Sequence, residues 1–108
     1  ALLGPMNVGN ALVESAAPYR HGRTRAGAGV QIDLLVQTKR VHYIVEIKRQ
    51  REIGREMIDE VESKVAKFGR PQGKSIRTVL VYDGALAPIV ETDGYFDALI
   101  SFRSLLCV

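Results

Sequence analysis

The sequence predicts an α/β domain in which a central mixed β-sheet of about four to five strands is crossed by one helix at about residues 53–68. Three observations support this prediction. Two strand-like runs, at residues 30–38 and 41–48, are separated by a short polar turn. A helical pattern follows them, and a second apolar run at residues 76–82 follows the helix. The order hairpin, helix, strand is typical of a mixed sheet with a helix over one face.

Residues 30–38 and 41–48 are predicted to form an antiparallel hairpin. The first run alternates and then becomes continuously apolar, and the second is rich in β-branched residues. The turn Thr38-Lys39-Arg40 is too short for a crossover connection, so the two strands should be antiparallel neighbours. His42 lies beside this turn and is predicted to be exposed.

The predicted helix has its apolar residues on one face, and these are Ile53, Met57, Ile58, Val61, Val65 and Phe68. Glu60 and Lys64 are spaced to form an i,i+4 ion pair. Glu52 and Glu56 lie at its start, where acids favour the positive end of the helix dipole. Gly69 is predicted to cap the helix, and Pro71 prevents its continuation.

The rest of the chain is read from its turn residues and apolar runs. Residues 1–10 are predicted to be a loose lead-in, 11–21 a strand or a short helix, and 22–29 a glycine-rich loop. Pro18 argues against a helix running through the second segment. After the strand at 76–82, Asp83-Gly84 is predicted to be a turn, followed by a loop through Pro88, a strand near 98–102 and a closing turn at 104–106.

The composition favours one globular domain, covering residues 11–108. The chain has 108 residues and 46% hydrophobic content, which can fill one core. No apolar run approaches the roughly 20 residues that span a bilayer, so no membrane partner is expected. Cys107 is the only cysteine, which excludes a disulfide framework and favours a cytoplasmic protein. The start at Ala1 suggests a fragment of a longer chain, or a processed protein.

The net charge of +3 is unevenly distributed. Residues 39–55 contain six basic and two acidic side chains, a local net charge of +4. Such a cluster is expected of a phosphate-binding surface, although a solvated basic face is the plainer alternative. The candidate nucleic-acid contacts are Arg23, Arg25, Lys39, Arg40, Arg49, Arg51 and Arg55.

Three charged residues, Asp33, Glu46 and Lys48, lie within the two apolar strands of the predicted hairpin. Strand interiors normally exclude charge because desolvation is costly. Side chains alternate along a strand, so Glu46 and Lys48 should share a face, and Asp33 can reach them across the hairpin. Two carboxylates are suitable ligands for Mg²⁺ or Mn²⁺, and a lysine could stabilise charge on a phosphate ester. Alternatively, Glu46 and Lys48 form a solvated ion pair with Asp33 exposed nearby.

The spacing of Asp33 from Glu46-Ile47-Lys48 resembles the signature of the PD-(D/E)XK nuclease superfamily, with Ile32 in place of the usual proline. This resemblance implies a restriction-endonuclease-like fold and Mg²⁺- or Mn²⁺-dependent hydrolysis of DNA. It also implies that Asp33 and Glu46 are metal ligands and that Lys48 is the catalytic lysine. In that family an acidic residue of the first helix often completes the site. Glu14 is the only acid before Asp33 and is therefore the candidate for that position.

The region from Gly29 to Lys48, the helix after it and the tail at 95–106 also resemble the C-terminal domain of bacterial and archaeal P-loop (AAA-type) ATPases. The resemblance implies an ATPase domain of the parent chain as a partner. No Gly-x-x-x-x-Gly-Lys-Ser/Thr motif occurs in this sequence, so no ATP site is expected within it. One alternative to a nuclease is a non-catalytic module that binds DNA or protein. Another is an assembly role, such as a homodimer, which pairing through an exposed sheet edge would favour.

Overall fold

The computed structural model describes residues 13–21, 29–69 and 73–106. The predicted lead-in, most of the glycine-rich loop, Pro71 and Cys107 lie outside these residues. Strands and helices follow one another in the order β1 (Val13–His21), β2 (Val30–Thr38), β3 (Val41–Ile53), α1 (Arg55–Phe68), β4 (Ser75–Leu86), α2 (Pro88–Thr92), β5 (Ala98–Ser101) and α3 (Phe102–Leu106).

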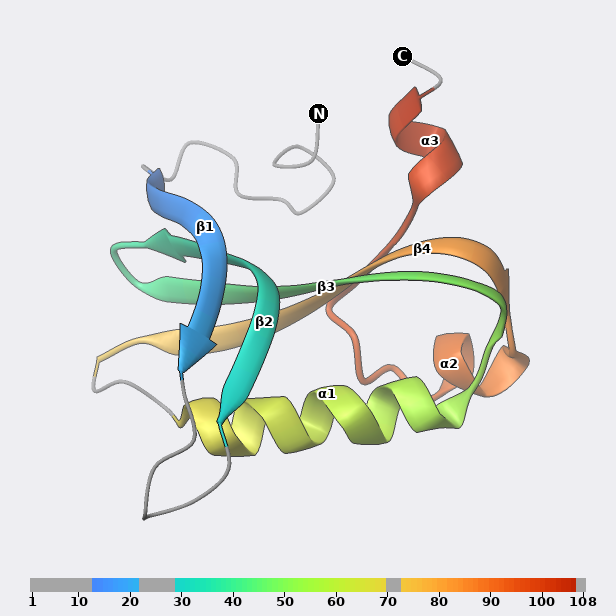
Figure 1. Cartoon of the computed structure of the whole chain (residues 1–108), viewed down its shortest axis with the longest axis horizontal. Helices are drawn as coiled ribbons and strands as arrows, with labels where there is room; N and C mark the ends of the chain where they lie inside the picture. Colours follow the sequence, from blue (N-terminus) through green and yellow to red (C-terminus); the bar gives the residue numbers. More distant parts are fainter. Residues whose placement is uncertain (1–12, 22–28, 70–72, 107–108) are drawn as a thin grey trace.

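The strands form one mixed sheet, in which they lie side by side in chain order (Figure 1). Antiparallel pairing joins β1 to β2 and β2 to β3, whereas β3, β4 and β5 are parallel neighbours. The helix α1 provides the crossover from β3 to β4 that a parallel pair requires. The predicted α/β class, the mixed sheet and the crossover helix are therefore confirmed.

The predicted hairpin between residues 30–38 and 41–48 is also confirmed. Its ladder pairs Gln37 with His42 and continues to Leu34 and Val45. Thr38 closes the turn, because its hydroxyl both donates to the Val41 carbonyl and accepts from the Val41 N–H, each at 3.1 Å. Lys39 and Arg40 are exposed at the tip of this hairpin.

Two apolar layers lie on opposite sides of the sheet. On one side α1 and α2 contribute Met57, Val61 and Val90, among others, to clusters with the strand residues Ile44 and Leu80. Each fully buried side chain of this kind contributes about 1.5–3 kcal/mol, so the apolar face of α1 is its principal attachment to the sheet. The other layer contains Val36, Tyr43, Val45, Val79, Val81 and Ile100, with Leu105 of α3 packed against it.

The helix α1 begins two residues later than predicted. Ile53 is the last residue of β3, and Gly54 separates that strand from α1. Glu56 lies in the first helical turn, as predicted, and its carboxylate accepts the Gly54 N–H at 3.1 Å. Glu52 instead belongs to β3, so its predicted place at the helix start is wrong. The cap at Gly69 is confirmed, because its N–H bonds to the Val65 carbonyl.

Strands β3 and β4 are both longer than predicted. Arg49 and Arg51 were expected just past the strand, but β3 continues to Ile53. The predicted turn at Asp83-Gly84 is wrong, because β4 runs through it and pairs with this extension of β3. Gly84 permits the pairing: a Cβ atom there would lie 1.7 Å from the Gln50 carbonyl oxygen, and its φ of +140° disfavours other residues.

The structure also decides between strand and helix for residues 13–21 and shows what the segments around β5 form. Residues 13–21 form an edge strand, β1, in which Pro18 is exposed. The predicted loop through Pro88 contains the short helix α2, and the closing turn after β5 is the short helix α3. His42 was predicted to be exposed, but it is buried, with 6% exposure, because it faces α1 and packs on Phe68 at a ring-centroid distance of 5.7 Å.

Candidate functional site

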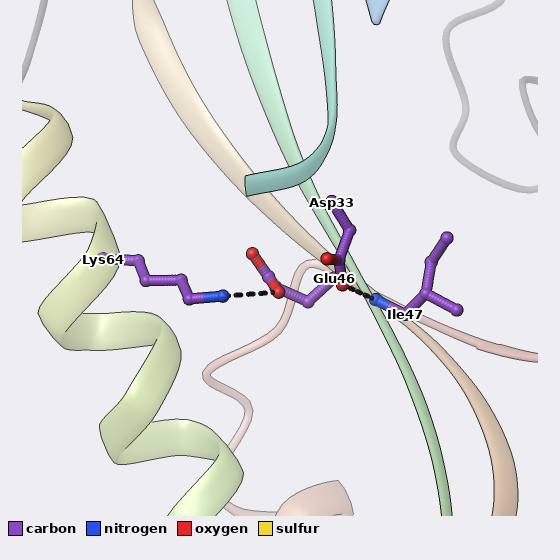
Figure 2. A network of polar contacts seen from close by, with 4 residues as sticks. All are labelled: Asp33, Glu46, Ile47 and Lys64. Carbon is purple, nitrogen blue, oxygen red and sulfur yellow. Dashed lines mark hydrogen bonds and ion pairs between the residues drawn. The ribbon is translucent and has the colours of Figure 1, made fainter. Parts of the chain in front are cut away.

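Asp33 and Glu46 meet where the β2–β3 ladder ends. The last paired residues are Leu34 and Val45, and Asp33 and Glu46 are the next residues beyond this pair on the two strands. The negative charge of Asp33 raises the pKa of Glu46, so the two carboxylates lie close together. The Asp33 carboxylate accepts the backbone N–H of Ile47 at 2.9 Å, in place of a strand partner (Figure 2). The structure therefore brings together the two carboxylates that the sequence predicted to converge.

Glu46 points toward α1 and forms an ion pair there. The Lys64 ammonium nitrogen lies 2.9 Å from Glu46 Oε2, as Figure 2 shows. The Glu46 residue is 2% exposed, and the Lys64 side chain is 21% exposed. Glu46 Oε1 is buried and has no hydrogen-bond partner within the described residues. One oxygen of this carboxylate is therefore held by Lys64 of the helix, and the other is buried without a hydrogen-bond partner among the described residues.

The surroundings of Glu46 raise its pKa from the ordinary carboxyl value to about 7. Burial is the largest cause, because it disfavours the charged form. The hydrogen bond and positive charge of Lys64 act in the opposite direction, and the negative charge of Asp33 raises the pKa further. The carboxyl group is thus close to its midpoint at neutral pH, which is unusual and occurs often at functional sites.

Lys48, the predicted catalytic lysine, lies two residues beyond Glu46 on β3 and is half-buried. Within the described part of the chain it takes part in neither of the two ion pairs, Lys64–Glu46 and Arg49–Asp83. The predicted pair between Glu60 and Lys64 is also replaced, because Lys64 turns toward Glu46. The lysine in contact with the candidate site is therefore Lys64, which the sequence analysis did not select.

A signal for Lys64 exists in the sequence. Met57, Val61 and Phe68 define the buried stripe of α1, and Lys64 lies between them at helical spacing. A lysine inside an apolar stripe implies a partner on the surface that the stripe covers. By that reasoning the sequence could have predicted that Lys64 pairs with Glu46, the carboxylate within the apolar part of β3.

Glu14, the candidate third ligand, lies on a strand and away from the other two acids. It is exposed on β1, between Val13 and Ser15, which pair with Thr38 and Gln37. Asp33 lies four residues further along β2 from Gln37, a distance of about 13 Å at the usual strand rise. The charge of Glu14 instead acts on His42, whose pKa is lowered by burial and by Lys74 and raised in part by Glu14.

The donors for a divalent cation can be tested against this geometry. Among the described residues there is no group of three or more His, Cys, Asp or Glu side chains that could hold a metal ion. The charge of Asp33 acts on Glu46, and Glu46 contributes a buried oxygen that has no partner among the described residues. Mg²⁺ is commonly held by one or two carboxylates, with water and substrate phosphate in its other positions. Two carboxylates therefore fit a Mg²⁺ or Mn²⁺ ion that is completed by substrate.

The predicted nucleic-acid contacts do not form one patch. Arg23 and Arg25 lie outside the described residues. Lys39 and Arg40 occupy the hairpin tip, whereas the exposed Arg49 and Arg51 lie toward the other end of β3, about 30 Å away along the strand. Arg55 is also exposed and is the first residue of α1. Arg49 approaches Asp83 at 3.4 Å with its side chain 78% exposed, so this ion pair is weak.

Comparisons with protein-family models, with curated proteins and with solved structures found no match to this chain. The restriction-endonuclease-like assignment and the two resemblances therefore stay predictions. In the part of the chain that the structure describes, no helix is long and apolar enough to cross a membrane.

Proposed function

We propose that this domain is a metal-dependent phosphodiesterase of the nuclease type that acts on DNA, with Asp33 and Glu46 as the ligands of Mg²⁺ or Mn²⁺. The observation that carries the proposal is the meeting of these two carboxylates at the end of the β2–β3 ladder, with a buried, unpartnered oxygen on Glu46. Charge is costly on apolar strands even when it is paired, so its presence in such a place favours function.

The proposed chemistry is hydrolysis of a phosphodiester. The oxygen of a water molecule bonds to phosphorus while the bond from phosphorus to one ester oxygen breaks. The attacking water loses a proton to solvent, and the leaving oxygen gains one. A divalent cation supplies charge neutralisation at the phosphate and a more acidic water. Asp33 and Glu46 would hold that cation, and the Ile47 N–H donates to Asp33 and would keep it in position for this task.

Plasmid and branched DNA, incubated with Mg²⁺ or Mn²⁺, provide the test. We expect cleavage by the wild-type protein and at least a hundredfold slower cleavage by Asp33→Asn and Glu46→Gln, because each removes a charged ligand. The exposed residues Asp93 and Glu60 provide matched controls, and Asp93→Asn and Glu60→Gln should cleave at the wild-type rate. Cleavage that survives in Asp33→Asn would show that the activity does not come from this site.

A second candidate function is a non-catalytic module that binds DNA or a protein partner. The ion pair between Lys64 and Glu46 favours it, because the ammonium group already neutralises the buried carboxylate. Calorimetry with Mn²⁺ separates the two functions. Binding that is lost in Asp33→Asn supports the phosphodiesterase, whereas no binding at millimolar Mn²⁺ together with intact DNA binding supports the module.

The setting of the domain is part of the same proposal. A single cysteine, Cys107, suits the reducing cytoplasm. An ATPase domain in the same parent chain would be its nearest partner, as the second resemblance implies. Size-exclusion chromatography of the intact parent protein, with and without ATP, would show whether the two parts act in one assembly.

A further inference from the structure

Lys64 lies where a lysine is costly unless it has a task. It occupies the apolar stripe of α1, and only 21% of its side chain is exposed. Three of the neighbouring stripe residues, Met57, Ile58 and Val61, are buried. Removing an ammonium group from water is expensive, and one hydrogen bond to Glu46 offsets only part of that cost.

We propose that Lys64, and not Lys48, is the catalytic lysine of the candidate site, contacting a phosphoryl oxygen of the substrate held at Asp33 and Glu46. The inference rests on the proposed function and names the residue that would complete it. It replaces the lysine implied by the Glu46-Ile47-Lys48 resemblance with one supplied by the crossover helix.

The contacts favour Lys64 over Lys48. Lys64 Nζ is 2.9 Å from Glu46 Oε2, so the ammonium group is already in contact with a proposed ligand. Lys48 lies about 6.6 Å further along β3 by strand rise and is engaged in no ion pair among the described residues. A phosphate bound at the two carboxylates would therefore meet an ammonium group, that of Lys64, which already contacts Glu46.

The donor count of Lys64 permits this second contact. An ammonium group has three N–H donors, and the described residues contain one acceptor for Lys64, Glu46 Oε2. A phosphoryl oxygen could take another donor without breaking the pair. Because the group is largely shielded from water, its charge acts strongly on charge that develops at phosphorus. Lys64 transfers no proton in this role.

The position of Lys64 can be tested in the wild-type protein without any turnover. Mn²⁺ broadens nearby nuclear resonances, and the effect falls steeply with distance. We expect the ¹³C-labelled ε-methylene signal of Lys64 to broaden at lower Mn²⁺ than that of Lys48. Asp33→Asn should abolish the broadening of both signals. The variants Lys48→Arg and Lys64→Arg assign the two signals.

Two outcomes of that titration oppose the inference in different ways. Stronger broadening of Lys48 than of Lys64 overturns the choice of lysine and leaves the metal site intact. Broadening of neither signal at millimolar Mn²⁺ overturns the metal site, and with it both the proposed function and the inference.

Kinetics provide a second, independent readout. Lys64→Met should lower kcat by a hundredfold or more with little change in KM, because it removes charge stabilisation from the transition state. Lys64→Arg should recover part of kcat, and Lys48→Met should change kcat by less than threefold. If Lys64→Met does not fold, the kcat of Lys64→Arg is compared with that of Lys48→Met, and the inference requires the larger loss in Lys64→Arg. Loss of kcat in Lys48→Met alone would overturn the inference.

Discussion

Glu46 is the residue whose surroundings differ most from those in water. It is 2% exposed, it has one ion-pair partner, and its second oxygen is unpaired among the described residues. This environment raises the pKa of the carboxyl group to about 7, so its neutral and charged forms are nearly equally populated at neutral pH. Small changes in its neighbours can therefore change its charge at physiological pH.

This balance predicts a pH dependence of stability with an unusual sign. The pKa of Glu46 is raised on folding, so the folded state holds the proton more tightly than the unfolded state. As the pH rises from about 4.5 to about 7, the contribution of Glu46 to the free energy of unfolding should fall by about 3 kcal/mol. Above about pH 8, where the folded state has also lost the proton, that contribution should stay constant.

Urea unfolding at several pH values, compared with Glu46→Gln, measures this contribution. Glutamine cannot titrate, so the unfolding free energy of the wild type should fall relative to that of Glu46→Gln as the pH rises. Glu60→Gln, an exposed change on α1, is the control and should follow the wild type at every pH. A difference that is constant from pH 4.5 to pH 8 would contradict the raised pKa.

The sequence predicted part of this site, and the missing part has a physical reason. Asp33 and Glu46 were found because strand alternation and hairpin register are short-range rules. Lys64 is 18 residues from Glu46, and its pairing depends on how α1 lies across the sheet. The burial of His42 was missed because its place near a turn outweighed the alternation that aligns it with Glu46.

At the scale of elements, the attachment of α1 to the sheet combines apolar packing with one buried ion pair. His42 and Glu46, on the helix-facing side of β3, contact Phe68 and Lys64 respectively. The apolar contacts contribute most of the stability, whereas a buried ion pair often contributes little net free energy. Removal of one partner is different, because it leaves an uncompensated buried charge.

We therefore expect Lys64→Met to lower the free energy of unfolding by up to about 3–5 kcal/mol at pH 8, because Glu46 must then either stay charged without its partner or bind a proton. The double change Glu46→Met with Lys64→Met should recover most of that loss. Lys67→Met, on the exposed side of α1, is the matched control and should change stability by less than about 0.5 kcal/mol. Denaturant unfolding measures all of these, and failure of the double variant to recover would show that the pair itself stabilises the domain.

The junction of β3 and β4 depends on Gly84. A side chain there would meet the Gln50 carbonyl oxygen, and the φ of +140° adds backbone strain. We expect Gly84→Ala to destabilise the protein by about 3 kcal/mol or more. Gly94 also has a positive φ, of +72°, but a Cβ atom there meets nothing within 4 Å, so Gly94→Ala should cost only about 1–2 kcal/mol. Equal losses in thermal unfolding would show that the contact with Gln50 is unimportant.

This junction also explains why the element boundaries were the weakest part of the sequence analysis. Asp-Gly is typical of turns because glycine accepts a positive φ. Gly84 uses the same freedom inside a strand, to let the extension of β3 approach closely. The local sequence cannot distinguish the two uses, since the difference lies in Gln50, a residue 34 positions away.

At the scale of the whole molecule, the positive charge lies at two ends of the sheet. Lys39 and Arg40 lie at the hairpin tip, and Arg49 and Arg51 lie on the extension of β3 beyond the candidate site. Asp33 lies where β2 stops pairing with β3, so the site adjoins the part of β3 that carries Arg49 and Arg51. If the domain binds DNA at this site, that end should make the phosphate contacts.

We expect Arg49→Gln with Arg51→Gln to weaken DNA binding and to reduce the dependence of log K on log salt concentration by about 2, because two phosphate contacts are lost. Lys39→Gln with Arg40→Gln removes the same charge at the other end and should leave that salt dependence unchanged. Fluorescence anisotropy with a labelled duplex at several salt concentrations measures both. The opposite result would place DNA on the hairpin tip.

The hydrogen bond from the Ile47 N–H to Asp33 has a consequence for how the chain finds its pairing. If β2 slipped by two residues along β3, each side chain would stay on the same face of the sheet. Burial alone therefore does not distinguish the slipped alignment from the native one. Here the slipped hairpin would lose the 2.9 Å bond that ends the native ladder and would carry the Asp33 charge away from its donor. We therefore expect Asp33 to favour the native alignment of β2 on β3 over the slipped one.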